Sequence, residues 1–165
     1  MTKEQATKET REIIESNRYM TLATTDGKMP WASPVYYSVD ENYNFFFVSS
    51  KEARHSKFIE SNSQVSLAIF NSTLPSMEVN GVQVEGKASL VSAADLPGVI
   101  RNYYQKVRKL EKSIGKESLL AGRYKGLRLR RFYKIQPTRF YTLGYGKEGV
   151  DIRVEVLLED LKDNE

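Results

Sequence analysis

Cysteine is absent from this sequence of 165 residues, and histidine occurs once, as His55. Without cysteine the chain can form no disulfide, no thiolate-bound metal site and no catalytic thiol. A single imidazole also excludes multi-histidine metal sites, and no serine lies in the nucleophile elbow of a Ser-His-Asp hydrolase. These absences point to a bound cofactor as the source of any redox chemistry.

Long apolar runs are missing as well. The longest runs, 45–48 and 67–70, have the length of a β-strand, whereas a membrane-spanning helix needs about 20 apolar residues. The N-terminus is polar and lacks the features of a secretion signal. We therefore expect a cytoplasmic protein without a membrane span.

The net charge of +4 is unevenly distributed along the chain. Residues 101–139 carry 13 basic and two acidic side chains, and the rest of the chain is acidic on balance. Two interpretations of this basic block remain open. It is either an ordinary solvated face of a helix and a strand, or a surface that faces an anion or a nucleic acid.

Sequence periodicity predicts three helices. The first begins with a capping box formed by Thr2 and Gln5, and the last begins with a similar pair, Ser92 and Asp95. Apolar residues at three- and four-residue steps follow each pair, as expected for a helix with one buried face. The predicted helices are 1–17, about 50–62 and 94–114.

The strands follow from alternating apolar and polar residues between turn signals. They are predicted at 19–25, 30–39, 45–48, 64–70, 82–90, 127–135 and 139–143. Gly86 interrupts the apolar face of its strand, which is typical of a bulge or a close backbone approach. A small antiparallel barrel leaves no unpaired sheet edges. We therefore expect residues 1–165 to form one mainly β domain with peripheral helices.

A candidate anion-binding segment spans residues 49–57. Ser49 and Ser50 end an apolar strand where a helix is expected to begin, and either hydroxyl can cap that helix. Arg54 and His55 follow in the first turn. Because a helix N-terminus offers unpaired N–H groups and arginine adds a two-pronged donor, the segment suits a phosphate. The alternative is an ordinary serine cap followed by exposed charges.

Four segments occur in a fixed order along the chain. They are MTLATTDGKMPWASPVYY, NFFFVSSKEARHSKFIESNSQVSLAIF, GVQVEGKASLV and FYKIQPTRFYTL. Over residues 12–156 this order resembles the pyridoxamine 5′-phosphate oxidase-like family of FMN-binding split barrels. The resemblance implies a split antiparallel, Greek-key-like β-barrel, and a homodimer that holds FMN at the subunit interface.

The resemblance also implies which residues contact the cofactor. The family's phosphate-binding Ser-Arg-Lys triplet corresponds to residues 53–55, in which Arg54 matches. The strand along the flavin ring corresponds to residues 33–38, Gln83 replaces a family glutamine, and Arg153 matches the last arginine of the C-terminal motif. The implied cofactor-binding residues are Ser33, Val35, Tyr36, Val48, Ser49, Ser50, Arg54, His55, Gln83 and Arg153.

Other positions depart from the family's oxidases. His55 stands in place of the phosphate-binding lysine, so its charge depends on a pKa near 6.5. Gly149 and Asp151 stand where the oxidases have an arginine and a histidine that bind the vitamin B6 substrate. The resemblance therefore implies an FMN-dependent oxidoreductase acting on an unidentified small molecule, and not a true pyridoxamine 5′-phosphate oxidase. No side chain is identified as catalytic.

Two further functions remain open. A small barrel can bind single-stranded nucleic acid by stacking and phosphate contacts, although the sequence contains no RNA-binding motif. The tyrosines of the basic block are Tyr103, Tyr104, Tyr124 and Tyr133. Some relatives of this fold bind heme or a deazaflavin, and His55 could then ligate a heme iron, but the alignment requires it at the phosphate site.

Overall fold

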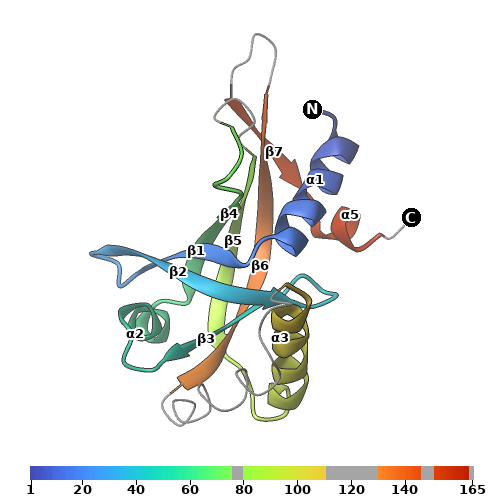
Figure 1. Ribbon diagram of the computed structural model, residues 1–165. Coiled ribbons are helices and arrows are strands. Elements are labelled where there is room, and N and C mark those ends of the chain that lie inside the picture. The colour runs from blue at the N-terminus through green and yellow to red at the C-terminus, as the bar shows by residue number, and fades with distance from the viewer. Residues whose placement is uncertain (76–79, 111–129, 146–150, 164–165) are drawn as a thin grey trace.

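The computed structural model describes residues 1–75, 80–110, 130–145 and 151–163. In these ranges seven strands form one sheet, with four helices around it (Figure 1). The strands are β1 (Tyr19–Thr25), β2 (Pro30–Val39), β3 (Phe45–Ser50), β4 (Gln64–Phe70), β5 (Gly81–Leu90), β6 (Arg130–Tyr145) and β7 (Asp151–Val156). The helices are α1 (Lys3–Ser16), α2 (Arg54–Ser61), α3 (Leu96–Leu110) and α5 (Leu158–Lys162).

The sheet closes on itself to form a barrel. Its strand order is β3-β2-β1-β4-β5-β6-β7, and all the pairings are antiparallel. Because β3 also pairs with β6, six strands form a ring and β7 extends the sheet from β6. The prediction of a mainly β antiparallel barrel with peripheral helices is confirmed.

The C-terminal strands differ from the sequence prediction. We expected two strands, at 127–135 and 139–143, separated at Pro137. Residues 127–129 lie outside the described part of the chain, and β6 runs without a break through the proline. The prediction also missed β7 and α5. Seven strands are therefore present, as expected, but the last two are divided differently.

A bulge in β6, where Thr138 has no partner in β5, lets this strand contain a proline. Proline has no N–H to donate to the strand ladder, and its partner Gly86 lies where the register between β5 and β6 shifts. A Cβ atom on Gly86 would lie 2.7 Å from the carbonyl oxygen of Gln136. The close backbone approach predicted at Gly86 is therefore found, and the bulge lies in the partner strand.

The barrel core contains side chains from all six strands of the ring and from the helices. Phe45 and Phe47 point into the core, whereas Phe46 between them packs outside the barrel against α3. This explains why the β3 sequence is apolar on both faces. The helices α1 and α2 add Ile14 and Ile59 to the same core cluster, so each of them covers part of the barrel interior.

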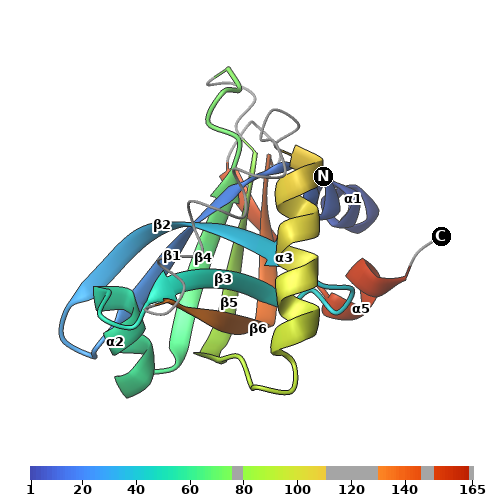
Figure 2. The ribbon, with the colours of Figure 1, turned by 60° about the horizontal axis from the view of Figure 1, so that its bottom comes forward.

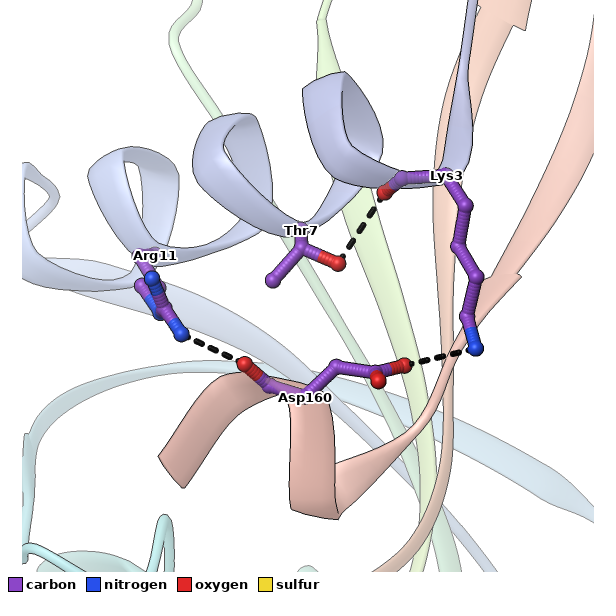
Figure 3. A network of polar contacts seen from close by, with 4 residues as sticks. All are labelled: Lys3, Thr7, Arg11 and Asp160. Carbon is purple, nitrogen blue, oxygen red and sulfur yellow. Dashed lines mark hydrogen bonds and ion pairs between the residues drawn. The ribbon is translucent and has the colours of Figure 1, made fainter. Parts of the chain in front are cut away.

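The chain ends meet where α1 contacts α5 (Figure 3). The Thr2 cap of α1 is present as predicted, because Gln5 N donates to Thr2 Oγ1 at 3.2 Å and Thr2 N donates to the Gln5 side chain at 2.8 Å. Lys3 forms an ion pair of 3.0 Å with Asp160 of α5. Arg11 donates to the backbone carbonyl of the same aspartate. These contacts fix the C-terminal helix against the first one.

The helix α3 covers the outer face of β2, β3 and β6. Its buried residues are Val99, Tyr103 and Val107, which pack on Phe46 and Phe132. Tyr103 and Val107 belong to the predicted apolar stripe, whereas Val99 was not predicted. The helix starts slightly later than predicted, and residues 111–114 lie outside the described ranges. Within those ranges no helix is long and apolar enough to cross a membrane.

Candidate functional site

The N-terminus of α2 is the first candidate cofactor contact. The predicted serine cap is wrong, because Ser49 and Ser50 belong to β3 and the N-cap residue, Ala53, makes no side-chain cap hydrogen bond. Ser56 Oγ instead donates to the carbonyl of Ser50 at 2.7 Å. The first three N–H groups of a helix have no intrahelical acceptor, and the helix dipole places partial positive charge there. The first turn of α2 can therefore receive an anion.

Arg54 is the first residue of α2 and is exposed. Its guanidinium carbon lies 4.3 Å from the centre of the Trp31 ring, as in a cation–π contact. Asp26, in the β1–β2 turn, has a lowered pKa because the N–H groups of Met29 and Lys28 bond its carboxylate, and the charge of Arg54 adds to the effect. A stacked guanidinium keeps its in-plane N–H donors for other partners.

His55 links β2 to β3 through its two ring nitrogens. Ser33 Oγ of β2 lies 3.0 Å from Nδ1, and Ser49 Oγ of β3 lies 2.6 Å from Nε2. The ring also packs edge-on against Phe47, with 6.0 Å between ring centres. Burial lowers the pKa of His55 below its usual 6.5, so the imidazole is mostly neutral at pH 7. It does not supply the lasting charge of the lysine that it replaces.

The link through His55 occurs where β2 and β3 have separated. Their backbone pairing covers residues 37–39 and 45–47, and both serines lie beyond it. Both ribbon views place α2 beside these diverging strand ends (Figures 1 and 2). The imidazole thus joins the strands where the ladder has ended, and it fixes the first turn of α2 to both.

A second group of predicted residues meets on the outer face of the sheet. Arg153 of β7 donates from Nε to Gln83 Oε1 of β5 at 2.8 Å. Both residues line a depression of about 430 Å³. Small side chains of β1 and β4 form part of its lining, namely Thr21, Ala23, Ser66 and Ala68. Gln83 and Arg153, which the family resemblance assigns to FMN binding from separate motifs, are therefore in contact.

The remaining predicted residues are packed against apolar neighbours. Val35 belongs to the barrel core. Tyr36 and Val48 pack on the cluster under α3, where the Tyr36 ring lies edge-on to Tyr103 with 5.5 Å between centres. A contact of these three side chains with a cofactor stays a prediction.

Sequence reasoning missed the contact between Trp31 and Arg54. Trp31 is 39% exposed near the start of β2. No sequence pattern identifies its partner, because Arg54 lies on another element after an intervening strand. The β1–β2 hairpin thereby contributes to the surroundings of the α2 N-terminus.

Two of the four tyrosines considered for stacking on nucleic-acid bases are buried. Tyr103 is 5% exposed and Tyr133 is 1% exposed, because both belong to hydrophobic clusters. Tyr124 lies outside the part of the chain that the structure describes. Two of the four tyrosines are therefore unavailable for stacking on a base.

Comparison with known families decides the family to which this fold belongs. The family model of pyridoxamine 5′-phosphate oxidase matches residues 6–144. This chain belongs to that family. The matched segment of this pyridoxamine 5′-phosphate oxidase family member includes α2 and Gln83, whereas Arg153 lies beyond it.

A curated relative and two solved structures resemble this family member. A UPF0306 protein of Pasteurella multocida is 33% identical over 79 residues, which are 47% of this chain and 53% of the relative, so the match spans about half of that protein. A heme binding protein from Mycobacterium smegmatis has a TM-score of 0.71 and 20% identity, covering 95% of this chain and 60% of that one. A FAD-binding protein from Mesorhizobium loti has a TM-score of 0.61 and 15% identity, covering 86% and 94%. At these identities the two structures show the fold alone.

Proposed function

We propose that this protein binds FMN as a homodimer and uses it for electron or hydride transfer with a small substrate. The observation that carries the proposal is the N-terminus of α2, which has no side-chain cap and holds exposed Arg54 in its first turn. Free N–H groups, the helix dipole and a guanidinium meet at one point, and this arrangement suits a phosphate. Membership of the pyridoxamine 5′-phosphate oxidase family supports the same cofactor.

The residues present fit the FMN phosphate through Arg54 and the helix more than through His55. The imidazole is mostly neutral and both of its nitrogens are engaged by serine hydroxyls. Its role in the proposal is to fix the first turn of α2. Gln83 and Arg153 offer polar groups to the flavin from the outer face of the sheet. Bound FMN would supply the redox chemistry, while the chain binds and orients it.

The proposed second subunit would cover the outer face of β1 and β4. Two large side chains on this face are exposed, Tyr19 by 59% and Phe70 by 52%. The small side chains beside them form a shallow surface. Exposed apolar groups on such a surface suit a partner chain, and the family commonly holds its flavin between two subunits.

The proposed substrate is not a vitamin B6 phosphate. Asp151, which stands where the family's oxidases have a substrate-binding histidine, is exposed at the start of β7. A carboxylate there would repel a substrate phosphate, because like charges across a site oppose binding. Gly149, at the other departing position, lies outside the described residues.

Heme is the less favoured cofactor. His55 is the single histidine of the chain, and its two nitrogens bond Ser33 and Ser49. Iron ligation would break at least one of these bonds and draw the ring out of its contact with Phe47. The absorption spectrum of the purified protein separates the two cofactors, because flavin and heme absorb differently.

The test is a titration of the full chain with FMN, followed by flavin fluorescence, with riboflavin as the phosphate-free control. Arg54→Ala is expected to weaken FMN binding by about 10- to 100-fold, because hydrogen bonds to charged groups contribute about 1.5–3 kcal/mol. Riboflavin binding should change little. The matched control is Arg101→Ala, which removes an exposed arginine on α3 and should leave both affinities unchanged.

Two outcomes would contradict the proposal. One is a protein that shows no flavin binding at micromolar concentration. The other is an Arg54→Ala variant that loses FMN and riboflavin affinity equally, since this would mean that the arginine does not contact the phosphate.

A further inference from the structure

A second cavity lies on the other side of the molecule from α2. Its volume is about 410 Å³, and α1, α3, α5 and the β2–β3 connection line it. Both ribbon views show these helices opposite α2 (Figures 1 and 2). The volume falls in the range of about 300–1,000 Å³ that small-molecule sites occupy. Nothing in the proposed flavin site uses this cavity.

Lys106 of α3 is a partly buried amine in the wall of this cavity. Its Nζ lies 3.5 Å from the centre of the Tyr37 ring and 3.4 Å from the carbonyl oxygen of Ile14. The hydroxyl of Tyr37 donates to the same oxygen at 2.6 Å, so this carbonyl accepts a hydrogen bond from each group. Within the described ranges Lys106 forms no ion pair with a carboxylate. One long hydrogen bond and one cation–π contact therefore hold the amine.

Charged and titratable groups face Lys106 from each surrounding element. They are Glu15 of α1, Asp40, Glu41 and Tyr43 of the β2–β3 connection, Lys109 of α3 and Lys162 of α5. Asp40 is committed to its own turn, where its carboxylate accepts backbone N–H groups. Burial lowers the pKa of Lys106 to about 7; the charge of Glu15 opposes this effect and that of Lys109 adds to it.

Part of the cavity wall is apolar. Val39, Tyr43 and Leu161 line it, and the Tyr43 ring is fixed by an edge-on contact with Phe140 at 6.2 Å between centres. A small molecule with an apolar body can pack on this wall while it presents a reactive group to Lys106. The cavity therefore combines a nucleophile with a surface that can orient its target.

We propose that Lys106 and this cavity form a binding site for a small aldehyde, which the lysine captures as an imine. The amine nitrogen attacks the carbonyl carbon and a C–N bond forms. The carbonyl oxygen then leaves as water with two hydrogens from the amine, which leaves a C=N bond. The step needs no oxidant or reductant, and it needs the neutral amine because only that form carries a free electron pair.

The test uses benzaldehyde with sodium cyanoborohydride, which reduces each imine to a stable amine, on the full chain at pH 7. Labelled lysines are identified by peptide mass spectrometry. About half of an amine with a pKa near 7 is neutral at this pH, against about 1 in 2,500 for an ordinary lysine. We expect Lys106 to be labelled at least about tenfold faster than Lys87, an exposed lysine of β5 that does not line the cavity.

The pH and concentration dependence separate a built site from an accidental reaction. Between pH 7 and pH 9 the neutral fraction rises about twofold for Lys106 and about 100-fold for an ordinary lysine, so the labelling ratio should fall by about 50-fold. Labelling of Lys106 should also saturate with benzaldehyde concentration, whereas that of Lys87 should rise linearly. Lys106→Met should remove the fast component and leave the other labelled peptides unchanged.

The proposal is overturned if Lys106 is labelled no faster than Lys87 at pH 7, or if its rate rises linearly with benzaldehyde. Both measurements are made with and without FMN. Because the cavity lies away from α2, labelling is expected to be the same in the two conditions. A failure of flavin binding would therefore leave this result intact, and the reverse also holds.

Discussion

Replacing Gly86 with alanine is expected to lower the free energy of unfolding by about 1 kcal/mol. The added Cβ would lie 2.7 Å from the carbonyl oxygen of Gln136 and 2.9 Å from Ile135 Cγ2. The oxygen belongs to the backbone of β6, so the two strands must separate by about 0.7 Å to restore an ordinary contact of 3.4 Å. Overpacking of this kind destabilises the folded protein by about 1–3 kcal/mol. Alanine also restricts the unfolded chain more than glycine does, and this effect stabilises the folded protein by only about 0.4–1 kcal/mol.

The matched control is Gly98→Ala. Gly98 lies in α3 and has no atom within 4 Å of the position of a Cβ, so alanine should stabilise the protein by about 0.5–1 kcal/mol. Thermal unfolding followed by circular dichroism measures both changes. For a chain of this size the expected shifts are about −2 to −4 °C for Gly86→Ala and a small increase for Gly98→Ala. An unchanged or raised melting temperature for Gly86→Ala would refute the argument from close backbone approach.

Two further predictions concern buried polar groups. Because His55 is the single histidine, its imidazole NMR signals need no assignment, and they should titrate with a midpoint below 6.5; a midpoint at or above this value would contradict the burial argument. The unfolded chain then binds the proton more readily than the folded one, so the free energy of unfolding in urea should fall as the pH drops below about 6.5. Thr10 donates to the carbonyl of Ala6 at 2.7 Å and so accepts from Thr142, which makes the two threonines unequal. By urea unfolding, Thr10→Val should cost about 1–3 kcal/mol because it leaves the Thr142 hydroxyl unpaired, and Thr142→Val should cost less; equal costs would contradict this assignment of donor and acceptor.

Features set by neighbouring residues could be predicted from the sequence. The Thr2 cap needs a partner three residues away, and the Tyr103 stripe repeats at helical spacing, so both follow from local pattern. The unusual position of Gly86 is visible because a glycine interrupts an alternating strand. The joining of Gln83 to Arg153 was anticipated only through the family resemblance, since no local pattern links them.

Features set by partners far apart in the chain escaped prediction. A proline normally ends a strand, and β6 continues through Pro137 because the register with β5 shifts there, beside the close approach of Gly86. The expected cap of α2 failed because Ser49 is committed to β3, where its hydroxyl bonds His55. The neutral state of that histidine depends on burial by three separate elements. A pattern of residue types records neither the partner nor the burial.

Barrel closure by β6 has a consequence for biosynthesis. The strand β6, which pairs with both β3 and β5, is the last of the ring to leave the ribosome. Until it emerges, the five earlier strands can form only an open sheet with two unpaired edges. One of these edges is β3, whose sequence begins with Phe45-Phe46-Phe47-Val48. An exposed apolar edge of this kind pairs readily with another chain. During synthesis the protein is therefore most vulnerable to aggregation before residue 145 has emerged, and a chain that stops short of β6 would retain that vulnerability permanently.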